Sequence, residues 1–187
     1  MLKSIYIRSV LKVLSFFLLA GFTFSCSEEL NFDQYEDLEV RPTLETSIFF
    51  IKTQESIINR INGINFFTQE FNFDAFEEAF FADRVLEGAI TYELQNTTSK
   101  EVEISIEFLD IDGTVLDTEF FRLDPAPTAT LQRVVAYGNA GKSLEILRNT
   151  SDIRLGARNL GDNTSTSDFP DPSLILRSSG AFTLRIK

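Results

Sequence analysis

Residues 86–109 read LEGAITYELQNTTSKEVEISIEFL, and their hydrophobic pattern indicates the class of fold. Apolar or small residues alternate with polar ones in both halves of this stretch, and polar residues 96–100 separate the halves. A period of two is typical of strands that pack one face on a core and expose the other to water. Because sheets with one wet face are usually antiparallel, two antiparallel strands are expected. Their inward side chains are Leu86, Gly88, Ile90, Tyr92 and Leu94, then Val102, Ile104, Ile106 and Phe108.

Other segments of the chain also have strand character. Alternation places Leu44, Thr46, Ile48 and Phe50 on one face of an earlier strand. Asp112-Gly113 predicts a tight hairpin into a strand over residues 114–123. Many short strands separated by turns predict a mainly β domain over residues 43–187, folded as an antiparallel two-sheet sandwich. Further strands are expected over 130–136, 152–160, 173–177 and 181–187, with an exposed loop over 161–173.

One short helix is expected between the strands. Asp74 stands in N-cap position and Glu77 follows three residues later, which is the spacing of a capping box. Phe76 and Phe80 then share a helical face. We therefore expect both rings to seal one end of the core.

The composition argues against several classes of function. The net charge is −11, and residues 1–25 hold three basic residues and no acidic one, so the remainder carries 14 basic and 28 acidic residues, a net charge of −14. Such a surface repels nucleic acid, which is bound through clustered Lys and Arg. Histidine is absent, which removes the usual general base near neutral pH and the commonest metal ligand. A single cysteine cannot form an internal disulfide.

The first 26 residues have the composition of an export signal. Lys3, Arg8 and Lys12 precede an apolar run over residues 13–24 that is too short to span a bilayer comfortably. The run ends at Thr23-Phe24-Ser25-Cys26, which resembles the lipobox of bacterial lipoproteins, although Thr23 and Phe24 depart from its usual Leu and small residue. The resemblance implies that residues 1–25 are a removed signal peptide and that Cys26 is lipidated. A plain signal peptide, or a short signal anchor, is the alternative.

The residues after Cys26 predict the location of the protein. Ser27-Glu28-Glu29 resembles the acidic export signal of surface lipoproteins of Bacteroidota. The resemblance implies a lipid-anchored protein of the outer membrane on the cell surface, with the periplasmic face as the alternative. Residues 26–42 are acidic and lack a clear period, so we interpret them as a tether.

A second resemblance concerns the middle of the chain. Ala89-Ile90-Thr91-Tyr92-Glu93, continued through Asn96-Thr97-Thr98 to Phe108-Leu109-Asp110, resembles two adjacent strands of immunoglobulin-like modules. The same stretch is similar to one in uncharacterised Bacteroidota lipoproteins. The resemblance implies an immunoglobulin-like sandwich and no particular activity, because such sandwiches serve many functions.

Two motifs have the appearance of ligand sites. Residues 136–143, AYGNAGKS, resemble a phosphate-binding loop with Lys142 and Ser143 in the key positions. That loop needs a parallel βαβ unit, whereas the flanks here are antiparallel, so we predict a Gly-rich turn and no nucleotide. Asp110-Ile111-Asp112-Gly113 matches part of a calcium loop, but the hairpin explains it. Asp162, Asp168 and Asp171 of the late loop are the other candidate for a cation. We expect no metal and no cofactor.

Phenylalanine supplies the only indication of a partner. Neighbouring residues of a strand face opposite sides, so one member of each adjacent Phe pair is expected outside. The pairs Phe66-Phe67 and Phe80-Phe81 therefore form the predicted partner patch.

The sequence predicts a membrane-anchored lipoprotein with a non-enzymatic role in binding or envelope assembly. An accessory subunit of an outer-membrane transport or secretion complex is one alternative. A glycan-binding or hydrolytic surface protein is the other, and it is disfavoured because the chain has no Trp and only four Tyr. We predict no catalytic residues.

Overall fold

A computed structural model of the protein describes residues 39–61, 65–73, 76, 78–126, 130–139 and 141–186. The chain divides into Met1–Leu38 and Glu39–Lys187, and the second unit holds every described strand and helix. Cys26, the export residues Ser27, Glu28 and Glu29, and the capping pair Asp74 and Glu77 lie outside the described residues. The described fold begins before residue 43, because Val40 forms an antiparallel bridge with Ile186.

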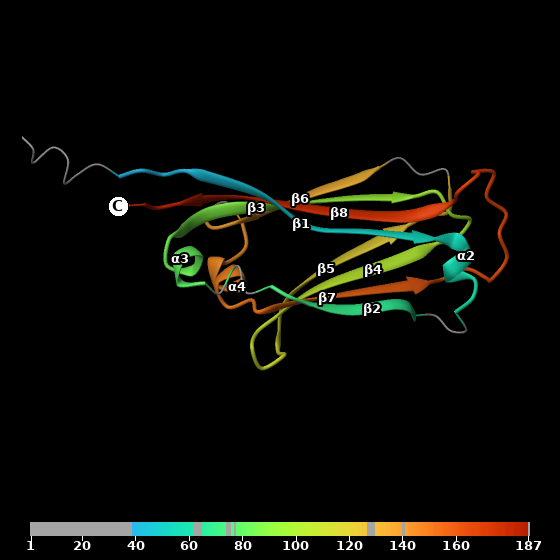
Figure 1. Ribbon diagram of the computed structural model, residues 1–187, viewed down its shortest axis with the longest axis horizontal. Coiled ribbons are helices and arrows are strands. Elements are labelled where there is room, and N and C mark those ends of the chain that lie inside the picture. The colour runs from blue at the N-terminus through green and yellow to red at the C-terminus, as the bar shows by residue number, and fades with distance from the viewer. Residues whose placement is uncertain are drawn as a thin grey trace, which may run out of the picture. The chain divides into compact units, whose positions relative to one another are not determined.

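Two antiparallel four-stranded sheets pack face to face, which confirms the predicted sandwich (Figure 1). One sheet has the order β1-β8-β3-β6, and the other has the order β2-β7-β4-β5. The strands are β1 (Thr43–Gln54), β2 (Asn65–Asn72), β3 (Val85–Asn96), β4 (Val102–Leu109), β5 (Val115–Leu123), β6 (Leu131–Tyr137), β7 (Asp152–Asn159) and β8 (Ser173–Leu184).

The strand order is that of a jelly roll. The chain passes from one sheet to the other at every connection except the β4–β5 hairpin, and β1 pairs with the last strand, β8. An immunoglobulin sandwich instead places its first two strands side by side in one sheet. The order therefore differs from the immunoglobulin-like one that the resemblance implied. Alternation within a strand determines which face is buried, but it carries no information on which strands pair.

The core lies between the two sheets and is centred on β3 and β4. The predicted inward side chains Ile90, Tyr92 and Leu94 of β3 are fully buried, as are Val102, Ile104, Ile106 and Phe108 of β4. Each large apolar side chain buried in this way stabilises the fold by about 1.5–3 kcal/mol. Strands β7 and β8, the other two central strands, complete the core with Ile153, Leu155, Leu174, Leu176 and Phe182.

Irregular strands account for the differences from the predicted pattern. A bulge between Ser47 and Phe49 reverses the alternation of β1, so Phe50 points outward and is 61% exposed instead of sharing a face with Ile48. Strand β2 was not predicted. Strand β8 is continuous where two strands were expected, and its Gly180 leaves room for the ring of Phe182, which would lie 2.4 Å from an added Cβ.

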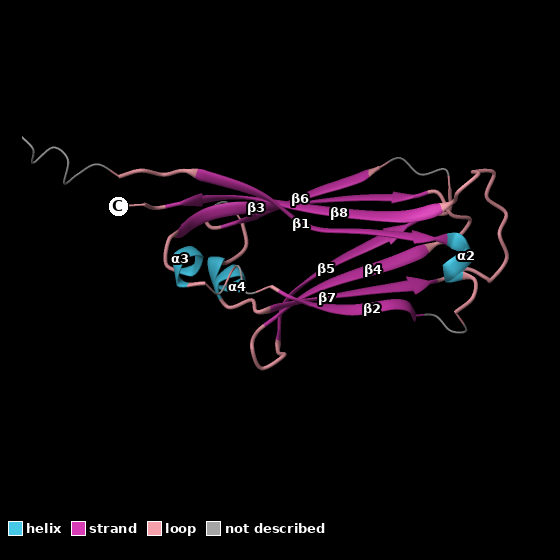
Figure 2. Cartoon of the chain, viewed as in Figure 1, coloured by secondary structure: helices cyan, strands magenta, loops and turns pink. Residues whose placement is uncertain are grey.

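Three short helices among the described residues close the ends of the sandwich, where one was predicted. Helix α2 (Glu55–Ile58) lies at one end, and α3 (Ala79–Ala82) and α4 (Leu144–Arg148) lie at the other (Figure 2). Helix α3 begins only at residue 79, too late for Phe76 and Phe80 to share a helical face. Phe76 is buried as predicted. The α3 residue that packs against Phe76 is Phe81 and not Phe80, because Phe80 points outward and is 53% exposed. No helix among the described residues is long and apolar enough to cross a bilayer.

Candidate functional site

The outer face of the β2-β7-β4-β5 sheet is covered by ion pairs. Strand pairing aligns Glu70, Arg154 and Glu107 in one row across three strands. Arg154 lies 2.6 Å from Glu70 and 2.9 Å from Glu107, and Arg158 lies 2.6 Å from Glu103 in a parallel row. The hydrogen bonds that Arg154 donates to Glu70 and Glu107 raise the pKa of its guanidinium. This face thus resembles the ordinary solvated face of a sheet, and Arg154 and Arg158 balance the acidic charge on it.

The outer face of the β1-β8-β3-β6 sheet is different, because its centre carries small, uncharged side chains. One row across the sheet is Ser47, Ser179, Thr91 and Val134, and the next is Glu45, Ala181, Ala89 and Ala136. A third row is Phe50, Arg177, Glu93 and Gln132.

Small side chains leave this face hollow. Two neighbouring depressions, of about 480 Å³ and 460 Å³, share Ser47, Thr91 and Ser179 as lining residues. Phe50, Arg177 and Glu93 line one of them, and Glu45, Ala89 and Ala181 line the other. Volumes of about 300–1,000 Å³ are usual for small-molecule sites. We call the two depressions together the open-face groove.

One end of the open-face groove presents an aromatic ring and a cation. The guanidinium carbon of Arg177 lies 5.6 Å from the centroid of the Phe50 ring. Arg177 forms no salt bridge with any residue that the structure describes, although Glu93 is its neighbour in register. The N–H donors of Arg177 therefore stay available to a ligand beside an exposed ring.

A buried polar network fills the end of the sandwich next to α2. Lys100 is almost fully buried, and its Nζ lies 3.9 Å from Oε1 of Glu55, which is fully buried. The same ammonium donates to Oδ1 of Asp162 at 2.7 Å and to the carbonyl oxygen of Thr164. Ser99 donates to Oε1 of Glu55 from its backbone nitrogen, at 3.2 Å, and from its hydroxyl. We call Glu55, Ser99, Lys100, Asp162 and Thr164 the end network.

The end network joins three separate segments of the chain, and its hydrogen bonds lower the pKa of Asp162. The hydrogen bond from Lys100, together with those from Thr164, lowers the pKa of Asp162 to about 2. Oε2 of Glu55 is buried without a hydrogen-bond partner among the described residues. All the groups of the network serve to hold the turn after β3, the loop after β7 and α2 together, so we assign it a structural role.

A second charged cluster lies between edge strands β5 and β6. Nζ of Lys142 donates to Asp117 and to Glu119, each at 2.6 Å. Arg133 lies 3.2 Å from the other oxygen of Glu119. Because both carboxylates are already held by cations, they are poorly suited to act as a free acid and base pair.

Two buried tyrosines adjoin this cluster. Burial raises the pKa of Tyr92, and the neighbouring Tyr137 and the charges of Glu119 and Asp117 add to the effect. Burial also raises the pKa of Tyr137, followed by the charge of Asp117. Both phenols thus stay neutral and belong to the core.

The stretch that resembles a phosphate-binding loop forms a turn after β6. The backbone nitrogen of Gly138 donates to the carbonyl of Lys142 at 2.8 Å, and that of Lys142 donates to the carbonyl of Ala136 at 2.8 Å. Gly138 has a φ of 101°, which favours glycine. The ammonium of Lys142 binds Asp117 and Glu119, and the hydroxyl of Ser143 caps α4.

The aspartates considered for calcium do not converge. Oδ1 of Asp110 accepts hydrogen bonds from the backbone nitrogens of Asp112 and Thr114, which closes the predicted hairpin. Asp162 binds Lys100, whereas Asp171 binds Lys52 at 2.9 Å. Across the described ranges, no group of three or more His, Cys, Asp or Glu side chains is arranged to hold a metal ion.

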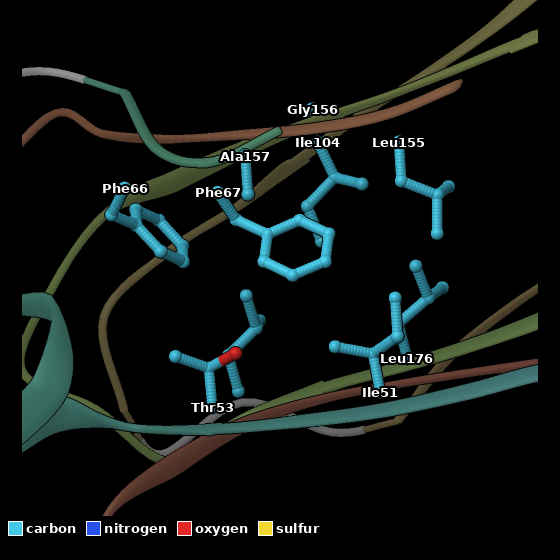
Figure 3. A pocket seen from close by; sticks show the side chains of 10 residues that line it. Ile51, Thr53, Phe66, Phe67, Ile104, Leu155, Gly156, Ala157 and Leu176 are labelled. Carbon is cyan, nitrogen blue, oxygen red and sulfur yellow. The ribbon is translucent and has the colours of Figure 1, made fainter. Parts of the chain in front are cut away.

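The predicted partner patch is not formed as expected. A bulge between Asn65 and Phe67 breaks the alternation of β2, so Phe66 and Phe67 both turn inward. Figure 3 shows both rings beside a small apolar cavity between the sheets. The volume of this cavity is about 20 Å³. Phe81 is buried as well, and only Phe80 of the four rings is exposed, under the guanidinium of Arg84.

Sequence reasoning missed the open-face groove. The outward positions of β3 are Glu87, Ala89, Thr91 and Glu93. Within one strand, the small side chains of Ala89 and Thr91 do not by themselves indicate a binding site. The groove exists because β8 brings Ser179 and Ala181 beside Thr91 and Ala89. Only knowledge of the pairing of β3 with β8 could have revealed it.

No protein-family model and no curated protein matches the chain. The structure is similar to that of the infectious bursal disease virus VP2 subviral particle, with 16% identity, a TM-score of 0.37, and coverage of 79% of this chain and 33% of the virus chain. This chain therefore spans about a third of that protein. A pilus of Bacillus endospore appendages matches with 9% identity, a TM-score of 0.37, and coverage of 78% and 91%. The empty head of turnip yellow mosaic virus matches with 9% identity, a TM-score of 0.40, and coverage of 80% and 82%. Identities and TM-scores this low carry no implication for function.

Proposed function

We propose that this chain is a lipid-anchored binding protein of the outer membrane, and that its sandwich domain holds a ligand on the open-face groove without changing it chemically. The anchor rests on the lipobox-like sequence that ends at Cys26 and on the acidic residues Ser27-Glu28-Glu29. One lipid chain contributes about 0.8 kcal/mol per buried CH₂, so several chains on one cysteine anchor stably.

The proposed binding role is supported by the contrast between the outer faces of the two sheets. A sheet face that only meets water tolerates long charged side chains, as Arg154 and Glu107 exemplify on one side of the sandwich. On the other side, Ala89, Thr91 and Ser179 floor a hollow, and Ala is disfavoured on an exposed strand. This arrangement suits a face that a ligand covers.

The non-enzymatic role rests on how the titratable groups are used. Lys142 and Arg133 neutralise Asp117 and Glu119, and the ammonium of Lys100 is held by the end network. A charged group that is already held by neighbours of opposite charge stabilises a fold and has little left to offer a substrate.

Two experiments test the proposal. Incorporation of a labelled fatty acid and protease shaving of intact cells should both depend on Cys26, and Cys26→Ser should remain unprocessed or be released. Binding of the mature lipoprotein to isolated cell envelopes should fall at least tenfold in Ser179→Arg, which fills the groove, and should persist in Thr118→Arg. Thr118 is a matched control, because it is an exposed hydroxyl residue on the outer face of the opposite sheet. Equal binding by both variants would refute the groove as the binding face.

A further inference from the structure

The class of ligand is inferred from the side chains and the charges that line the open-face groove. This inference rests on the proposed function. We propose that the groove binds a neutral glycan. Its floor runs along β8 from Arg177 to Ala181, which is four residue-to-residue steps and therefore about 13 Å of strand. A site of that length receives a short segment of an extended chain.

The floor cannot pair with a peptide backbone. Strand β8 is hydrogen-bonded to β1 and β3, and β3 is hydrogen-bonded to β8 and β6, so their backbone groups are engaged on both sides. An added peptide strand pairs only with a free sheet edge. A ligand over these central strands is therefore recognised by side chains alone.

The side chains on the floor suit a ligand that carries its own hydroxyl groups. The hydroxyls of Thr91 and Ser179 make no hydrogen bond to any other described residue, and each can both donate and accept. Sugar hydroxyls have the same dual capacity. The guanidinium of Arg177 adds donors at one end, and the Phe50 ring adds an apolar platform for the C–H face of a sugar.

Charge favours a neutral ligand. Glu45 and Glu93 line the two depressions with Arg177 as the counter charge, and the whole chain has a net charge of −11. An acidic polymer would meet both carboxylates and the field of the protein. Neutral sugar hydroxyls can instead donate to these carboxylates and accept from Arg177.

A protein partner fits the same face less well. A stable interface buries about 800 Å² on each partner around an apolar centre. Here the two large exposed apolar side chains on the face, Phe50 and Val134, belong to opposite edge strands, β1 and β6. Hydroxyl and methyl groups occupy the centre between them.

The first test applies the mature, detergent-solubilised lipoprotein to an array of neutral and acidic oligosaccharides. We expect retention by neutral glycans, at least a tenfold loss in Phe50→Ala and in Arg177→Ala, and complete loss in Ser179→Arg. Thr118→Arg should bind as the unmodified chain does. Phe50 and Arg177 are exposed, so their replacement should leave the fold intact, which circular dichroism checks. Absence of retention by every glycan, or preference for acidic glycans, would overturn the inference.

The second test separates this inference from the proposed function. Isolated envelopes are treated with periodate, which cleaves sugar diols, or with protease, before the lipoprotein is added. Binding that depends on Ser179 and is lost after periodate supports a glycan. Binding that depends on Ser179 but is lost only after protease overturns the glycan and leaves the groove as a binding face. Binding that ignores Ser179→Arg refutes the proposed function itself.

Discussion

Removal of the ammonium of Lys100 should destabilise the sandwich strongly. Lys100→Met retains most of the side-chain volume but leaves the carboxylate of Glu55 fully buried without its counter charge. Loss of one partner from a buried ion pair costs about 3–5 kcal/mol. For a domain of this size, 1 kcal/mol corresponds to about 2–4 °C in Tm, so we expect a fall of roughly 6–20 °C.

Chemical and thermal unfolding followed by circular dichroism would measure the effect. The double variant Glu55→Gln/Lys100→Met removes both charges and should recover about half of the lost free energy of unfolding. Lys52→Met provides the control, because its ion pair with Asp171 is exposed on both sides and should cost less than about 1 kcal/mol. A loss below about 1 kcal/mol in Lys100→Met, or a double variant as unstable as the single one, would refute the assignment of a buried, charge-dependent end network.

Three further predictions concern acid, alkali and packing. The hydrogen bond from Lys100 lowers the pKa of Asp162 from 3.8 to about 2. The stabilising effect of the ionised Asp162 is therefore present above about pH 4 and is lost as the pH falls toward 2. An NMR titration of the Asp162 carboxyl carbon with a midpoint near 3.8 would contradict this prediction. Burial raises the pKa of Tyr92 and Tyr137 above the ordinary value of 10.0. Their contribution to stability is therefore complete below that pH and is lost as the pH rises further, so their tyrosinate absorbance should appear only as circular dichroism reports unfolding. Gly180→Ala would put a Cβ 2.4 Å from the ring of Phe182 and should cost about 1–3 kcal/mol in urea unfolding, whereas an unchanged midpoint would show that the ring can move aside.

Local pattern predicted which faces of the strands are buried. Ile90, Tyr92 and Leu94 of β3 were recognised as core from alternation alone, because the pleat places every second side chain on one side. Asp112-Gly113 was recognised as a hairpin for an equally local reason, since Gly113 adopts a φ of 79° that the turn requires.

Bulges defeated the same logic in β1 and β2. One extra residue in β1 sent Phe50 outward, and one in β2 turned Phe66 and Phe67 inward together. The predicted partner patch failed for this reason. A bulge depends on the neighbouring strand, so the alternation of one strand cannot reveal it.

Sequence alone determined the β-rich class, the core-facing residues of the central strands and the acidic surface. It also supplied the lipobox-like resemblance on which the proposed location in the outer membrane rests. Each of those properties depends on a single segment of the chain, because it follows from the period of the pleat, from composition or from a local motif. Tertiary structure decided the jelly-roll order, the end network and the open-face groove. Lys100 meets Glu55 and Asp162, and Thr91 meets Ser179, only because strands distant in the chain are paired, and one sequence without its fold does not state those pairings.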